Sequence, residues 1–159
     1  MSGVWCWPQP YEDYWERLLN GDGLNLVWAH HVNSWPDLFL HIQGKSSNVG
    51  IIEGDVFLQR SGAQHLPMLR IPPNPASNIS FPKWLKTTPA TGKAIWTNLM
   101  STDVVKPALQ YVFANKQHFT APFLIHAPIL PGPASIKASL FLIPNPLESP
   151  TALIGFSLL

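Results

Sequence analysis

The sequence predicts a single α+β domain with a mainly antiparallel twisted sheet, spanning residues 1–159. The length of 159 residues is typical of one domain. Helical spacing of apolar residues occurs near the N-terminus and again before residue 115, whereas most other apolar runs are short and separated by proline or glycine. Three such runs fill the last forty residues, which is typical of a C-terminal meander of three strands.

The composition is poor in charge and rich in proline. Charged residues make up 12% of the chain, about half the usual share. The 17 prolines are accompanied by 46% hydrophobic residues, so a folded core is expected rather than disorder. A low charge of this kind favours an apolar surface that binds a partner.

Local signals predict three helices. An apolar stripe at helical spacing begins after Pro10, and Asn20-Gly21 provides the stop. A second helix is expected from Ser101-Thr102-Asp103, which offers N-cap residues, to Asn115. The segment from Lys93 to Met100 is interpreted as a shorter helix between them.

The remaining apolar runs are predicted to be strands. These are residues 24–32, 37–43, 49–53, 55–60, the edge strand Leu66–Ile71, and the three final runs 118–129, 135–144 and 151–159. Turns are expected at 33–36 and at Glu53-Gly54-Asp55. The proline-rich stretch 72–93 is interpreted as a packed loop or short helix that could serve as a lid or binding loop. In element order alone, the chain resembles a PAS-like or profilin-like arrangement, in which helices close a pocket over one face of the sheet.

The segment "LVWAHHVNSWPDLFLHIQG", residues 26–44, contains His30, His31 and His41. On a regular strand, adjacent side chains point to opposite faces, so His30 and His31 could not bind one metal ion together. His41 on a neighbouring strand could oppose one of them, but a metal site would need further ligands. The residues able to supply them are Asp37, Glu53, Asp55, His65, His118 and His126. The favoured interpretation is half-buried histidines with no metal and no cofactor.

A hydrolase or phosphoesterase that uses His41 and His118 is the first alternative. The run His118-Phe119-Thr120 resembles one copy of the His-x-Thr/Ser motif of two-histidine phosphoesterases, whose histidines act as base and acid. The corresponding position after His41 holds Gln43 instead of a hydroxyl residue.

Anion or nucleic-acid binding through the basic segment 60–93 is the second alternative. Between Asp55 and Asp103 every charged residue is basic: Arg60, Arg70, Lys83, Lys86 and Lys93. Aromatic residues interleave with them, as in single-strand nucleic-acid grooves. Five charges over this length are dilute, however, so a solvated basic face is favoured over a nucleic-acid partner.

The leading hypothesis is a non-enzymatic module that binds a small apolar or aromatic molecule, a protein partner or a second copy of itself in a homodimer. The residues expected to form its binding surface are Trp28, His30, Trp35, His41, Trp84 and Trp96. The lone Cys6, the absence of a signal-like start and the absence of a long apolar run favour a cytoplasmic protein without membrane contact.

Overall fold

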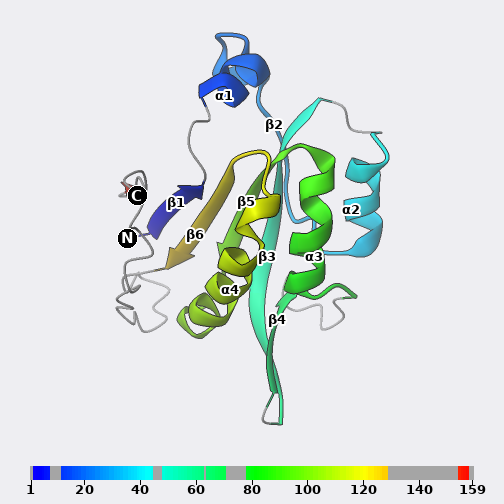
Figure 1. Cartoon of the computed structure of the whole chain (residues 1–159), viewed down its shortest axis with the longest axis vertical. Helices are drawn as coiled ribbons and strands as arrows, with labels where there is room; N and C mark the ends of the chain where they lie inside the picture. Colours follow the sequence, from blue (N-terminus) through cyan, green and yellow to red (C-terminus); the bar gives the residue numbers. More distant parts are fainter. Residues whose placement is uncertain are drawn as a thin grey trace.

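The computed structural model describes residues 2–7, 12–44, 48–62, 64–70, 78–128 and 154–157. A seven-stranded sheet forms its centre, and its strand order is β2-β3-β5-β6-β1-β7, with β4 paired to β3 (Figure 1). The strands are β1 (Ser2–Trp7), β2 (Val27–Ala29), β3 (Val49–Ser61), β4 (Gln64–Leu69), β5 (Ala94–Leu99), β6 (Phe123–Pro128) and β7 (Ile154–Ser157). The α-helices are α1 (Glu12–Leu19), α2 (Trp35–Ile42), α3 (Phe81–Thr87) and α4 (Thr102–Asn115). Three 3₁₀ turns join them: η1 (Gly23–Asn25), η2 (Thr88–Thr91) and η3 (Lys116–His118).

The central strands β2, β3, β5 and β6 are parallel to their neighbours. Among the described strands, the antiparallel pairs lie around this parallel group: β4 pairs with β3, β1 with β6 and β7 with β1. The prediction of a mainly antiparallel sheet is therefore wrong. The error arises from β3, whose first eight residues are all buried. A strand that is covered on both faces lacks the alternation of polar and apolar residues by which a half-buried antiparallel strand is recognised.

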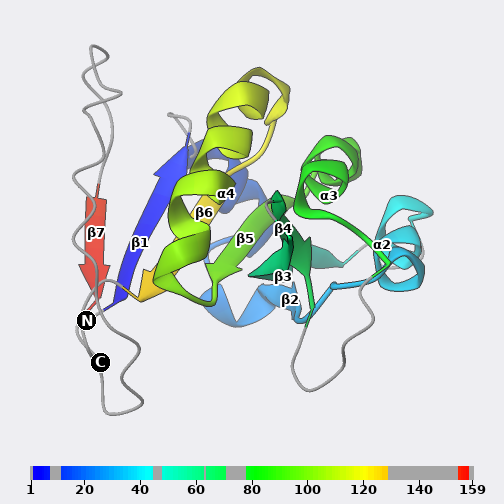
Figure 2. The ribbon, with the colours of Figure 1, turned by 90° about the horizontal axis from the view of Figure 1, so that it is seen from below.

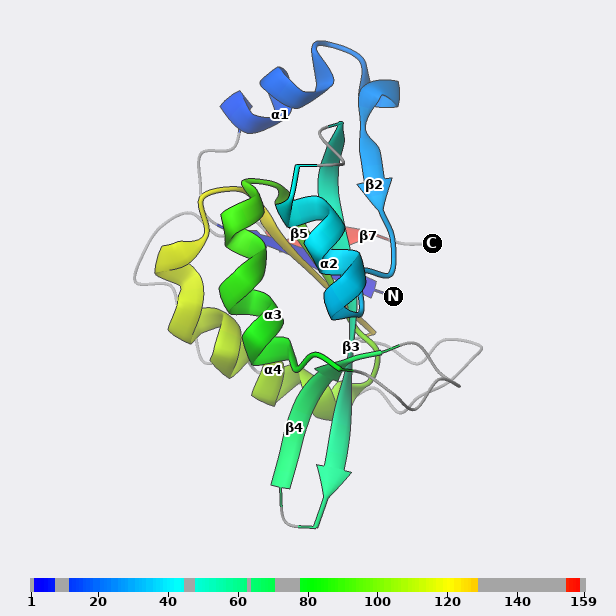
Figure 3. The same cartoon turned by 90° about the vertical axis from the view of Figure 1, so that its right-hand side faces the viewer.

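Helices α2, α3 and α4 lie on one face of the sheet (Figure 2). Each connects two neighbouring parallel strands, and each step moves in the same direction across the order β2-β3-β5-β6. Because such crossovers are right-handed, steps in one direction place every helix on the same face. Helix α1 instead lies across the end of the sheet where the parallel strands begin, and the β3–β4 ribbon projects beyond the opposite end (Figure 3).

The region predicted as a strand over 37–43 is helix α2. The Ser34 hydroxyl caps this helix by accepting a hydrogen bond from the Asp37 amide, and Pro36 occupies its first turn. The expected turn at 33–36 is thus the start of a helix. The strand predicted over 24–32 shrinks to the three residues of β2, after which the chain leaves the sheet.

The predicted turn at Glu53-Gly54-Asp55 is the middle of a continuous strand, β3. A Cβ atom on Gly54 would lie 2.8 Å from Leu69 Cδ1 and 2.9 Å from Trp84 Cζ2. The glycine therefore permits close approach of the Trp84 ring rather than a turn. The short helix predicted from Lys93 to Met100 is also wrong, because this segment forms the strand β5.

Several local predictions are confirmed. Helices occur at Glu12–Leu19 and Thr102–Asn115. The proline-containing run near Leu66 forms β4, which pairs with β3 and makes an isolated bridge between Met68 and Ser80. The short helix considered within the stretch 72–93 is α3, and residues 118–129 contain β6. Of the last two predicted strands, 151–159 contains β7, whereas 135–144 lies outside the described residues.

The core lies between the parallel strands and the helices. Its largest fully buried side chains are Trp84, Phe81, Phe123, Leu38, Ile52 and Leu69. Two of these come from α3, which lies within the stretch that the sequence presents as proline-rich. In the described part of the chain, no helix has the length and apolar character needed to cross a membrane.

Candidate functional site

His30 and His31 leave the sheet immediately after β2 and turn toward β3. His31 has a backbone φ of 57°, which lies in the left-handed region that residues other than glycine rarely adopt. A regular strand would send the two rings to opposite faces, but this residue breaks the alternation. The prediction that residues 26–32 form one regular strand is therefore wrong, and both rings reach the same strand, β3.

Each histidine contacts a carboxylate of β3. His30 Nδ1 is hydrogen-bonded to Glu53 Oε2, and His31 Nδ1 lies 2.8 Å from Asp55 Oδ2. Glu53 and Asp55 are two residues apart on a strand, so their side chains share one face. Both acids are buried, whereas the side chains of His30 and His31 are 58% and 57% exposed. The rings thus lie between buried carboxylates and solvent.

Two asparagines orient these carboxylates. Asn33 Nδ2 donates to Asp55 Oδ2 at 2.8 Å, while the Asp55 amide donates to Asn33 Oδ1 at 2.8 Å. Asn98 on β5 donates to Asp55 Oδ1 at 2.9 Å and also to Glu53 Oε1. With the His31 ring, the Asp55 carboxylate has three hydrogen-bond partners, so it is held in one orientation.

The backbone of the histidine segment is held from both sides. The Val32 amide donates to the Glu53 carbonyl at 2.8 Å, which ties the segment to β3. The Val32 carbonyl accepts a hydrogen bond of 3.0 Å from the fully buried Trp84 Nε1 on α3. Both bonds are made by Val32, the residue that follows His31. They therefore support the unusual backbone conformation of His31.

The environment moves the pKa values of two histidines in opposite directions. The hydrogen bond to Asp55 raises the pKa of His31 above 6.5, and the charge of Glu53 adds to this effect. Burial lowers the pKa of His126 on β6, although the charge of Glu53 acts in the opposite sense. His126 is next to Asn98 in the β5–β6 register, so a third imidazole lies on this face.

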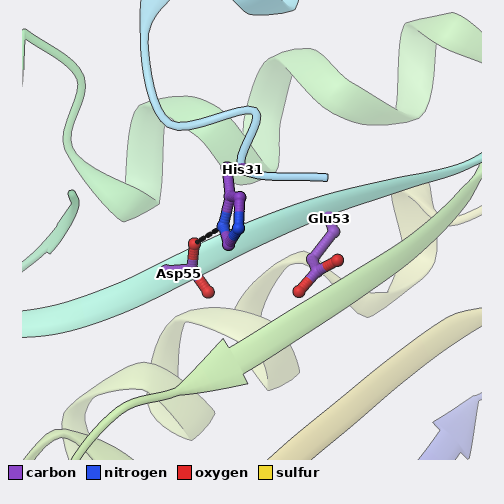
Figure 4. Close-up of side chains that lie close together, drawn as sticks. All are labelled: His31, Glu53 and Asp55. Atoms are coloured by element: carbon purple, nitrogen blue, oxygen red, sulfur yellow. Dashed lines mark hydrogen bonds and ion pairs between the residues drawn. The ribbon is translucent and has the colours of Figure 1, made fainter. Parts of the chain in front are cut away.

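His31, Glu53 and Asp55 form a candidate metal centre. One ligand atom from each residue lies within 4.8 Å of the others. Figure 4 shows the His31 ring beside Asp55, and Glu53 lies on the same strand as Asp55, β3. One imidazole and two carboxylates suit a divalent cation such as Mn²⁺, Mg²⁺ or Zn²⁺. Asn33 and Asn98, which donate hydrogen bonds to the carboxylates, would orient these ligands.

The cluster lies near the carboxyl ends of the parallel strands β2, β5 and β6. Asp55 pairs with Asn98 in the register, and Asn98 pairs with His126, close to where β5 and β6 end. Binding sites of parallel α/β sheets form at this edge, because the loops that leave the strands meet there. The position therefore agrees with the chemistry of the side chains.

A row of aromatic rings crosses the same face of the sheet. The His30 and Trp28 rings are stacked with centroids 5.1 Å apart, and Trp28 contacts Trp96 edge to face at 5.0 Å. His126 continues the row at 6.2 Å from Trp96. We call these four residues the aromatic row. It provides an apolar wall beside the carboxylates.

The structure divides the residues predicted to bind a ligand or partner. Trp28, His30 and Trp96 lie together in the aromatic row, whereas Trp35 and His41 lie on α2 and Trp84 is part of the core. For the phosphoesterase alternative, His41 lies on α2, His118 in η3 and Thr120 in the loop before β6. No contact between His41 and His118 is found among the described residues.

The predicted anion-binding residues are spread over several elements. Arg60 on β3 pairs with Asp103, and Arg70 lies over the Phe57 ring at 5.4 Å. Lys83 and Lys86 lie on α3. Lys93 precedes β5 and donates to the Val49 carbonyl at 2.7 Å. The nucleic-acid alternative stays a prediction.

Sequence reasoning did not assign the central residues of the site. Glu53, Asp55 and His126 appear in it only among possible additional ligands, while Asn33 and Asn98 are absent. The available signal was the spacing of two acids at i and i+2 within an apolar run, which places both on one strand face. It was obscured because Glu-Gly-Asp also has the composition of a turn.

Comparison with known protein families gives a matching family model. Residues 22–143 match the Menorin N-terminal domain. The chain belongs to this family. It is also similar to human Protein FAM151B, with 29% identity over 136 residues. This match covers 83% of the chain but 48% of the relative, so the chain spans about half the length of this curated protein. No solved structure matches the chain at a significant level.

Proposed function

We propose that this member of the Menorin N-terminal domain family carries a divalent-cation-dependent hydrolytic site for phosphoesters. The observation that supports this proposal is the convergence of His31, Glu53 and Asp55 at the carboxyl edge of the parallel strands. Two buried carboxylates together with an imidazole bind a divalent cation well, because the cation offsets their negative charge.

A cation bound there would act on a phosphoester in two ways. It would polarise a phosphoryl oxygen, and it would lower the pKa of a bound water molecule. In hydrolysis of a phosphodiester, the oxygen of this water would form a bond to phosphorus while the P–O bond to the leaving alcohol breaks. His30, whose ring is oriented by Glu53, would accept the water proton, and the leaving alkoxide would take a proton from solvent. The products would be a phosphate monoester and an alcohol.

Calorimetric titration with Mn²⁺, Mg²⁺ and Ca²⁺, followed by hydrolysis of bis(p-nitrophenyl) phosphate with the best cation, tests this proposal. His31→Asn should lose at least tenfold in cation affinity, as expected for removal of a ligand. This variant retains the fold because asparagine tolerates a positive φ. Glu16→Gln, at an exposed position of α1, is the control and should bind the cation normally. Equal affinity of His31→Asn and the control would exclude the site.

The aromatic row favours a second candidate, a non-enzymatic module that binds an aromatic or apolar molecule. Trp28 and Trp96 present rings at the edge of the carboxylate cluster. A binding module would show quenching of tryptophan fluorescence by diphenyl phosphate, and Trp96→Leu would weaken this quenching, yet no hydrolysis would occur with any cation. Turnover that depends on the cation would instead support the hydrolase.

A further inference from the structure

A pocket lies at the opposite end of the parallel strands from the carboxylate cluster. Its volume is about 420 Å³, within the range of small-molecule sites. Four parts of the chain line it: α1, the start of β3, the segment before β5 and the segment before β6. The lining residues are Tyr14, Arg17, Leu18, Val49, Thr91, Gly92, Lys93 and Thr120.

The chemistry of this lining is cationic. Arg17 and Lys93 contribute positive charge, Thr120 contributes a hydroxyl group, and none of the eight lining residues is acidic. The Thr91 hydroxyl already donates to the Thr88 carbonyl at 2.7 Å. Guanidinium, ammonium and hydroxyl groups are the side chains that bind phosphate oxygens. The carboxylate cluster at the other edge has the opposite charge, so the two ends of the sheet suit different ligands.

The pocket has a rigid frame. The Tyr14 hydroxyl donates to the Gly50 carbonyl at 2.8 Å and accepts a hydrogen bond of 2.7 Å from the Ala94 amide. These bonds join α1 to the first residues of β3 and β5. Lys93 Nζ donates to the Val49 carbonyl at 2.7 Å, which fixes the ammonium group at the wall. The Lys93 ammonium group is therefore positioned before any ligand binds, which lowers the entropy cost of binding.

The electrostatics agree with an anionic ligand. Burial lowers the pKa of Lys93, so its charge is only partly solvated by water. Burial, and then the charge of Lys93, lowers the pKa of His41 on α2. The positive charge of Lys93 thus acts on His41, outside the pocket lining. An anion bound beside Lys93 would reduce this effect on the pKa of His41.

We propose that this pocket binds the phosphate group of a small phosphorylated molecule. A phosphate dianion matches the two cations in charge, and its several acceptor oxygens match the N–H groups of Arg17 and Lys93 and the Thr120 hydroxyl. The site is independent of the cation centre, since it lies at the amino ends of the strands and contains none of the centre's ligands. Its occupant would contact α1 together with three other segments and so fasten that helix to the sheet.

The test is titration of the metal-free protein with inorganic phosphate, glycerol phosphate or glycerol in the presence of a chelator. Calorimetry measures affinity, and the NMR signal of the His41 ring reports on the field of Lys93. Both phosphates should bind and should raise the pKa of His41, whereas glycerol should do neither. Binding of glycerol phosphate but not of glycerol would assign recognition to the phosphate group.

Three variants make the test specific. Arg17→Gln, at an exposed position, should weaken phosphate binding about tenfold, as expected for one charge-assisted hydrogen bond. Thr120→Val should weaken it less, since it removes a neutral donor. Lys106→Met removes an exposed charge on α4 outside the pocket and should leave affinity unchanged. Absence of phosphate binding at millimolar concentration, or equal losses in Arg17→Gln and Lys106→Met, would overturn the proposal. His31→Asn should bind phosphate normally, so failure of the cation centre and failure of this pocket are distinguishable.

Discussion

The Trp84 indole nitrogen on α3 donates a hydrogen bond of 3.0 Å to the Val32 carbonyl. This bond connects the centre of the hydrophobic core to the segment that carries His30 and His31. Trp84 is fully buried, and its ring also approaches Gly54, between the two carboxylates of β3. One core residue therefore supports both segments of the candidate metal centre, the histidine segment and β3.

Trp84→Phe should lower stability and cation affinity together. The exchange removes the donor to the Val32 carbonyl and leaves a small cavity, which together cost about 2–4 kcal/mol in the free energy of unfolding. Urea denaturation measures this loss, and calorimetric titration with Mn²⁺ measures the affinity. Trp35→Phe, the same exchange at a half-buried position of α2, is the control. Unchanged affinity in a folded Trp84→Phe protein would show that this bond does not position His31.

Local signals were sufficient to predict α1, α4 and β4. Helix α4 begins after Ser101, and β4 contains Pro67, so each has a signal that acts within a few residues. Helix α2 was misread because its eight residues, WPDLFLHI, have too few turns to show a clear period and begin with a Trp-Pro pair typical of a turn. The direction of the strands depends on contacts between distant segments, which short windows of sequence do not contain.

The candidate site was harder to predict than the fold elements, for a related reason. The positive φ of His31 has no local signal, because neither glycine nor asparagine occupies that position. It is supported by the bonds of Val32 to Glu53 and Trp84, which lie 21 and 52 residues further along the chain. If His31 had an extended backbone conformation, the side chains of His30 and His31 would point to opposite faces of the sheet.

Gly54→Ala should destabilise the protein although alanine suits strands better than glycine. The added Cβ would meet Leu69 and Trp84 at less than 3.0 Å, so the core must shift, at a cost of about 1–3 kcal/mol. Thermal denaturation checks the loss. Gly23→Ala is the matched control, since nothing lies within 4 Å of its Cβ position, and it should change stability very little. Equal melting temperatures for the two variants would contradict the close packing of Trp84 against β3.

The contribution of His31 to stability should fall as pH rises. The hydrogen bond to Asp55 raises the pKa of His31 above its usual value of 6.5. A group whose pKa is raised by folding contributes its stabilisation fully below the unfolded pKa and loses it as the pH rises through the folded value. The difference in unfolding free energy between the wild type and His31→Asn should therefore shrink between pH 6 and about pH 8. Urea denaturation in metal-free buffer gives this difference, and a difference that grows with pH would show the opposite shift.

Cation affinity should change with pH in the opposite direction. Protons compete with a cation for the His31 ring, so affinity should increase as the pH rises through the pKa of His31. Calorimetric titration with Mn²⁺ at several pH values measures this trend. An affinity that stays constant from pH 6 to pH 8 would mean that His31 is not a ligand, even if the two carboxylates bind the cation.

Tyr14→Phe should loosen α1 from the sheet. Loss of the hydroxyl leaves the Gly50 carbonyl and the Ala94 amide without this partner, which costs about 1–3 kcal/mol because both lie at buried positions. Hydrogen exchange measured by NMR should show faster exchange of the Ala94 amide, since that proton is bonded to the Tyr14 oxygen. Tyr111→Phe removes a hydroxyl from half-buried Tyr111 on α4 and should leave this amide protected. If Ala94 exchanges at the same rate in both variants, the Tyr14 hydroxyl does not join α1 to the parallel strands, and the frame of the phosphate pocket must come from Lys93 alone.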